Sequence, residues 1–166
     1  MQGRTKMLAS CAALTALALI FSYIEFLIPL SITMPGIKLG LANIVIVVAL
    51  YAAGVRYALL INLARVALVA LLFGNMFSAL YALAGAAFSF AAMLLAKKAG
   101  IFSPAGVSVA GGVFHNVGQV IVAGIVMESA NIIYYFPVLL IAGLLSGAGI
   151  GILGTLILRA LQIKTE

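Results

Sequence analysis

Hydrophobic residues along the chain fall into six long runs, which short segments rich in charge, proline and glycine separate. The runs are Met7–Leu30, Leu39–Val55, Tyr57–Phe73, Asn75–Ala96, Ala105–Met127 and Ile132–Leu158. An α-helix rises about 1.5 Å per residue and needs about 17–25 residues to cross the hydrocarbon of a bilayer. The second and third runs lie near the lower end of that range. We therefore predict an all-α membrane protein with six transmembrane helices, forming one domain over residues 1–166.

The composition supports lipid as the surrounding solvent. Hydrophobic residues make up 66% of the chain and charged residues only 7%, whereas about a quarter of an average soluble domain is charged. This balance argues against a self-sufficient soluble enzyme. The net charge of +6 comes from cations scattered singly or in pairs, without the basic stripe of a nucleic-acid-binding protein.

The positions of lysine and arginine predict the orientation in the membrane, because cytoplasmic loops carry an excess of these residues. With the N-terminus inside, the cytoplasmic ends of the runs hold Arg4, Lys6, Arg56, Lys97, Lys98, Arg159 and Lys164. The outer loops hold only Lys38, and Arg65 lies within a run. We predict that both termini are cytoplasmic and that the protein spans the bacterial inner membrane.

Polar residues inside the hydrophobic runs are the main candidates for function, because they are costly in a bilayer. They are Glu25, Asn43, Asn62, Arg65, Tyr81, His115, Asn116 and Gln119, and Lys38 lies just before the second run. In one interpretation, Arg65 pairs with Glu25 and the amides tie helices together. In the other, the same residues line a solvated pocket open to the outside. Arg65 and Lys38 would then favour an anionic or carbonyl-rich ligand.

Residues for several chemistries are missing from the chain. It has no aspartate, and its only acids are Glu25, Glu128 and Glu166. Clustered carboxylates that could hold magnesium are therefore absent, as is a Gly-rich phosphate loop for ATP hydrolysis. His115 is the only histidine and Cys11 the only cysteine. We expect no enzymatic activity, no metal and no cofactor, and any energy for transport would come from an ion gradient or a partner ATPase.

Small residues recur at four-residue spacing on two of the predicted helices. Gly143, Gly147 and Gly151 share a face of the last helix, and Ala12 and Ala16 share a face of the first. Such faces let helices approach closely in lipid. They indicate either packing within the bundle or, on the first helix, docking of a partner membrane subunit.

Four motifs together resemble a known membrane family. They are Met34–Ile44 (MPGIKLGLANI), Asn62–Val66 (NLARV), Leu72-Phe73-Gly74 and His115–Gln119 (HNVGQ). The family is labelled both Gx transporter and heptaprenyl diphosphate synthase component I, and the resemblance runs from about Leu8 to Leu158. The synthase label conflicts with the residues, since prenyl diphosphate synthases use Asp-rich motifs with magnesium. Members of the family are also associated with flavin- and quinone-linked electron transfer.

The stretch Pro35–Asn43 also resembles the S components of energy-coupling factor (ECF) vitamin transporters. Those are six-helix proteins whose first helix meets a transmembrane coupling protein driven by two ATPases. The resemblance implies a docking face at Ala12 and Ala16 and a lid at Ser31–Lys38 over an outward-facing ligand site. The implied pocket residues are Asn43, Arg65, His115, Asn116 and Gln119.

The leading hypothesis is therefore a membrane-embedded, S-component-like subunit that takes a small solute from the outside and is energised by a partner. An alternative is a non-catalytic membrane subunit of prenyl diphosphate, quinone or flavin electron-transfer metabolism, with an isoprenoid or quinone-like ligand. A third is an autonomous proton-coupled carrier that relies on Glu25 and His115.

Overall fold

The computed structural model describes residues 2–28, 40–73, 76–127 and 134–163. Within these ranges the chain is helical, without strands, as the hydrophobic runs predict. The helices are α1 (Gln2–Leu27), α3 (Leu41–Ala52), α4 (Val55–Phe73), α5 (Met76–Ala99), α6 (Pro104–Met127) and α7 (Phe136–Ala160). The predicted all-α class is confirmed.

Helix α3 differs from the other described helices in its length. The other five are long and apolar enough to cross a membrane. The 12 residues of α3 span about 18 Å, against a hydrocarbon thickness of about 30 Å. The helix is bounded by glycines in left-handed conformation, Gly40 with φ 74° and Gly54 with φ 90°. These turns shorten the second predicted span, so the count of six crossings stays a prediction.

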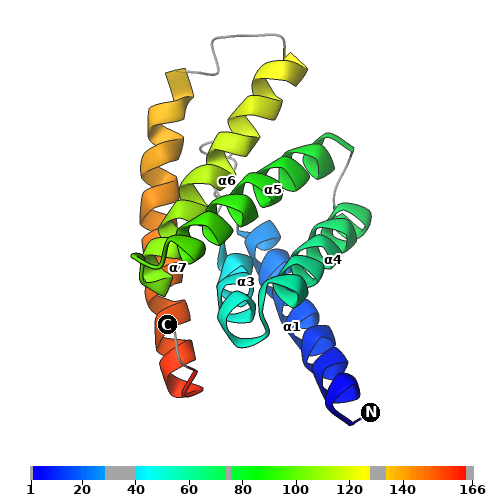
Figure 1. The fold of residues 1–166 in the computed structure, drawn as a ribbon. Helices are drawn as coiled ribbons and strands as arrows, with labels where there is room; N and C mark the ends of the chain where they lie inside the picture. Colours follow the sequence, from blue (N-terminus) through cyan, green and yellow to red (C-terminus); the bar gives the residue numbers. More distant parts are fainter. Residues whose placement is uncertain (1, 29–39, 74–75, 128–133, 164–166) are drawn as a thin grey trace.

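The helices form two groups (Figure 1). Helices α5, α6 and α7 pack side by side, and α1 and α4 pack on each other on the other side of the molecule. Helix α3 lies between the groups and contacts α1, α4, α6 and α7. The central position of α3 makes it the element through which the two groups meet, together with the contact between α4 and α5.

The buried core is built around α3. Eight of its 12 residues are buried, and Ile46 and Leu50 are fully enclosed. They pack in one cluster with residues of α4, α5, α6 and α7, among them Ile61, Met93, Val107 and Leu158. In lipid such packing stabilises through close contact between side chains, since lipid tails are as apolar as the core itself.

Helix α6 approaches α7 closely through glycines. A Cβ atom on Gly112 would lie 2.5 Å from the Gly143 carbonyl oxygen, and one on Gly151 would lie 2.6 Å from Ala105 Cα. A Cβ on Gly147 would lie 2.8 Å from Val109 Cα. The prediction that Gly143, Gly147 and Gly151 serve packing within the bundle is confirmed.

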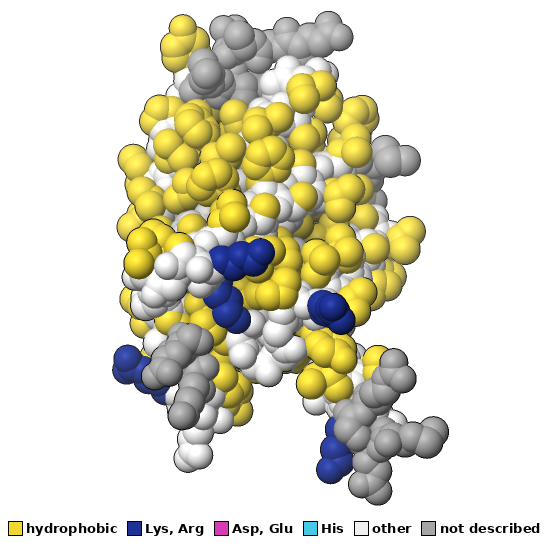
Figure 2. All heavy atoms as spheres, viewed as in Figure 1, with side chains coloured by type: hydrophobic (Ala, Val, Ile, Leu, Met, Phe, Trp, Pro, Cys, Tyr) yellow, Lys and Arg dark blue, Asp and Glu magenta, His cyan; other side chains and the backbone are white. Residues whose placement is uncertain are grey.

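The two described ends of the chain lie at the same end of the bundle, where α1 begins and α7 ends (Figure 1). Figure 2 shows the visible lysine and arginine side chains in the part of the face nearer this end, while hydrophobic side chains predominate among the coloured ones farther away. This distribution fits the predicted cytoplasmic location of both termini, which stays a prediction.

Candidate functional site

The polar residues selected from the sequence lie in two clusters. We define the Glu25 cluster, on α1, α3 and α4, as Ser22, Glu25, Gly40, Leu41, Asn43, Asn62 and Arg65. The His115 cluster, on α5, α6 and α7, comprises Gly85, His115, Asn116, Gln119 and Leu139. Helices α4 and α6, which carry Arg65 and His115, both pack against α5.

Glu25 caps the beginning of α3. Its Oε1 atom accepts hydrogen bonds from the backbone N–H groups of Gly40 and Leu41, the latter at 3.0 Å. The first N–H groups of a helix have no acceptor within the helix, and the hydrocarbon offers no water to replace it. The carboxylate also lies at the positive end of the helix dipole. Glu25 was predicted to bind a ligand, but one of its oxygens already accepts hydrogen bonds from the chain's own backbone.

Arg65 belongs to the same cluster. Its Nη2 atom donates to Asn62 Oδ1 at 3.0 Å, as their three-residue spacing on one helix face indicates. The negative charge of Glu25 lies within electrostatic reach of the guanidinium, and a direct pairing of Glu25 with Arg65 stays a prediction. Arg65 Nε is buried and has no hydrogen-bond partner among the described residues.

Two further side chains complete the Glu25 cluster. Asn43 is half-buried in the first turn of α3, and its backbone N–H donates to the Gly40 carbonyl at 2.8 Å. Ser22 lies one turn before Glu25 on α1 and is buried, and its Oγ has no partner within the described part of the chain. Sequence reasoning overlooked Ser22, although its three-residue spacing from Glu25 was a usable signal.

The His115 cluster holds α6 against both of its neighbours. The imidazole of His115 packs on Gly85 of α5, where a Cβ atom would lie 2.7 Å from His115 Cε1. Asn116 is buried, and its Nδ2 donates to the Leu139 carbonyl of α7 at 2.6 Å. Gln119 is 7% exposed, and its Oε1 has no hydrogen-bond partner in the described ranges.

The remaining predicted residues lie apart from these contacts. Tyr81 is half-buried in α5, and Ala12 and Ala16 are exposed on α1. Lys38 and the predicted lid Ser31–Lys38 lie outside the described residues. No group of three or more His, Cys, Asp or Glu side chains that could hold a metal occurs in the described part of the chain.

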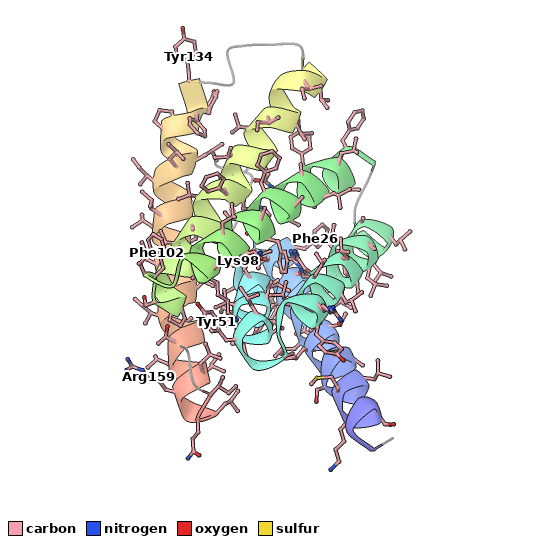
Figure 3. All side chains as sticks on the ribbon, viewed as in Figure 1. Phe26, Tyr51, Lys98, Phe102, Tyr134 and Arg159 are labelled. Carbon is pink, nitrogen blue, oxygen red and sulfur yellow. The ribbon has the colours of Figure 1, made fainter. Side chains whose placement is uncertain are left out.

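Lys97 makes a contact that sequence reasoning missed. It entered the sequence analysis only as a marker of orientation. In the structure its Nζ donates to the Leu50 carbonyl at 2.7 Å and lies 4.3 Å from the centroid of the Tyr51 ring. Tyr51 can be followed at the end of α3 in Figure 3. Lys97 therefore binds the last turn of α3, where helix carbonyls lack intrahelical partners.

An aromatic cluster joins the ends of α1 and α4 near Glu25. The ring of Phe73 lies 5.2 Å from that of Tyr23 and 5.8 Å from that of Phe26, centroid to centroid. Phe26 is labelled in Figure 3. These contacts fix the part of α1 that carries Glu25 against the helix that carries Arg65.

The helical fold, its apolar surface and the enclosed polar clusters define a multi-pass helical membrane protein. The chain belongs to the heptaprenyl diphosphate synthase component I family, whose model matches residues 14–157. The family assignment made from the sequence motifs is thereby confirmed. Searches of curated proteins and of solved structures give no significant match.

Proposed function

We propose that this protein is a membrane-embedded solute-binding subunit that takes a small polar molecule from the outside and is energised by a partner. The observation that carries the proposal is the incomplete hydrogen bonding of its interior. Gln119 Oε1 and Arg65 Nε are buried without hydrogen-bond partners among the described residues. A buried polar atom left without a partner costs about 1–3 kcal/mol. A ligand that meets these atoms would recover that free energy.

The chemistry of the two unpartnered atoms defines the ligand. Gln119 Oε1 accepts a hydrogen bond, so the ligand would present an N–H or O–H group to it. Arg65 Nε donates one, so the ligand would present a carbonyl or anionic oxygen there. An amide or a hydroxy acid carries both kinds of group and could therefore meet either atom.

Two of the predicted pocket residues form hydrogen bonds to the backbone of neighbouring helices. Asn116 donates to the Leu139 carbonyl, and Glu25 accepts from the first turn of α3. We propose that these two residues hold the helices around the site in place and do not contact the ligand. Lys38, Asn43, Asn62, Tyr81 and His115 remain candidates for ligand contact, with Arg65 and Gln119 as the leading ones.

The exposed face of α1 supports the proposal of a partner. Ala12 and Ala16 lie on the surface of the described structure, and small residues at this spacing allow a second helix to approach closely in lipid. A membrane-embedded coupling protein, linked to ATPases, would dock there and supply the energy. We propose no catalytic role for the chain, in keeping with the missing carboxylate cluster.

The test is a comparison of ligand content in purified protein. Native mass spectrometry of the wild-type protein should reveal a co-purified small molecule, and Gln119→Leu should reduce its occupancy at least about tenfold, the loss expected for one buried hydrogen bond. Ser108→Ala is the matched control, because Ser108 is a buried polar residue of the same helix. Wild-type protein that carries no molecule, or a Gln119→Leu protein that retains it fully, would contradict the proposal.

The description of the family favours a second candidate function. It names a component of heptaprenyl diphosphate synthase, so the chain would be the membrane subunit beside a separate catalytic component. Purification from membranes under mild conditions would decide between the two. A prenyl synthase or flavoprotein recovered without ATPases would favour the second candidate, and ATPases with a coupling protein would favour the first.

A further inference from the structure

Three cations lie around the end of α3. Lys97 of α5 donates to the Leu50 carbonyl and lies over the Tyr51 ring, so the ends of α3 and α5 meet. Lys98 is the exposed neighbour of Lys97, and Arg56 is exposed in the first turn of α4, which begins three residues after α3 ends. Lys98 and Tyr51 can be followed in Figure 3. We call Arg56, Lys97 and Lys98 the basic cluster.

The basic cluster has no acidic partner in the described part of the chain. The side chains of Arg56 and Lys98 form neither a hydrogen bond nor an ion pair with a described residue, and the partners of Lys97 are a neutral carbonyl and an aromatic ring. Glu25, the one acid among the described residues, binds the opposite end of α3. Like charges repel more strongly where lipid lowers the dielectric constant, so an anion from outside would stabilise this arrangement.

Large apolar side chains are exposed beside the basic cluster. The short turn from α5 to α6 leaves Ile101 81% and Phe102 49% exposed. Leu95 is 68% exposed, and its three-residue spacing from Lys98 places the two on one face of α5. In a membrane protein such apolar groups face acyl chains, while a lysine beside them extends its ammonium group toward the lipid head groups. The region therefore offers positive charge and apolar surface together.

We propose that the basic cluster and the turn from α5 to α6 bind an anionic phospholipid. The lipid phosphate pairs with Arg56 and Lys98, and the acyl chains pack on Leu95 and Ile101. Free phosphate would use the charge alone, and a zwitterionic lipid brings its own cation, so an anionic lipid fits both features best. The bound phosphate bridges the beginning of α4 and the end of α5. This inference goes beyond the proposed function and holds for any solute.

The experiment is native mass spectrometry of the full chain in detergent, with phosphatidylglycerol or phosphatidylcholine of identical acyl chains added. The wild type should retain phosphatidylglycerol in preference to phosphatidylcholine. Arg56→Gln and Lys98→Gln should each lower this preference about fivefold, which corresponds to the contribution of one cation near an anionic lipid surface. Both side chains are exposed and have no partner among the described residues, so both variants should fold.

Arg159→Gln is the matched control, because Arg159 is an exposed cation on α7 that lies apart from Lys98 in Figure 3. It should leave the preference nearly unchanged. Ile101→Ser should weaken the retention of both lipids equally. Equal retention of the two lipids by the wild type would overturn the proposal, as would a loss in Arg159→Gln equal to that in Lys98→Gln. Displacement of phosphatidylglycerol by excess inorganic phosphate would also overturn it, by showing a site for a free anion.

Discussion

The two helix groups of this protein are held together by different physical means (Figure 1). Helices α5, α6 and α7 approach through glycines, with backbone atoms in direct contact at Gly112 and Gly143. In the other group, Glu25 of α1 accepts hydrogen bonds from the beginning of α3, and Phe73 of α4 packs on the aromatic rings of α1. Glycine contacts depend on shape alone. Charged contacts also depend on protonation and on whether another charged group can take the place of one partner.

This difference predicts that one helix group is rigid and that the other can move. A glycine interface has no side chain that could adopt a second arrangement, so α6 and α7 form a rigid frame. The charged group contains the short helix α3, whose ends rely on side chains of other helices. Movement is therefore expected at the beginning of α3, against a frame formed by α5, α6 and α7.

Substitution at the glycine interface should have the largest effect. Gly112→Leu would place a side chain where even a Cβ lies 2.5 Å from the Gly143 carbonyl oxygen. We expect a loss of stability of more than about 1–3 kcal/mol, the usual cost of overpacking, because a backbone atom cannot yield as a side chain does. Thermal unfolding in detergent measures it. Gly149→Ala is the control, since no described atom from a neighbouring helix lies within 4 Å of its Cβ position, and an equal loss there would contradict the rigid frame.

The next effect concerns the tie between α6 and α7 beside that interface. Asn116→Leu removes the hydrogen bond to the Leu139 carbonyl, and such bonds between membrane helices contribute about 0.6–1.7 kcal/mol. We expect a lower midpoint of thermal unfolding, with the fold retained by circular dichroism. An unchanged midpoint would show that glycine packing alone holds the two helices together.

The smallest effect is expected at the end of α3. Lys97→Met should lower the stability by about 0.3–1 kcal/mol, the usual value of a charge at a helix terminus, because the Leu50 carbonyl loses its donor. Lys98→Met is the matched control, as Lys98 is the exposed neighbour. Chemical unfolding of both variants in one detergent measures the difference. Equal stability of the two variants would show that Lys97 does not stabilise the end of α3.

The bounds of the long helices could be predicted closely from the sequence. The run Ala105–Met127 became α6 (Pro104–Met127), and the run Tyr57–Phe73 became α4 (Val55–Phe73). Hydrophobic length decides such helices, because every backbone group in hydrocarbon must be satisfied within its own segment. The proximity of Asn62 and Arg65 could also be predicted from the sequence, since helical spacing alone brings the two side chains together.

Only the tertiary structure decided which partners the polar side chains have. Glu25, Lys97 and Asn116 each bind a backbone group of another helix, at Leu41, Leu50 and Leu139 respectively. A backbone N–H or carbonyl is present at every residue and leaves no trace in the sequence. Composition and periodicity therefore determined a helical membrane protein with costly polar residues inside it. The packing of α3 among four other helices determined that one acid and one lysine hold its two ends.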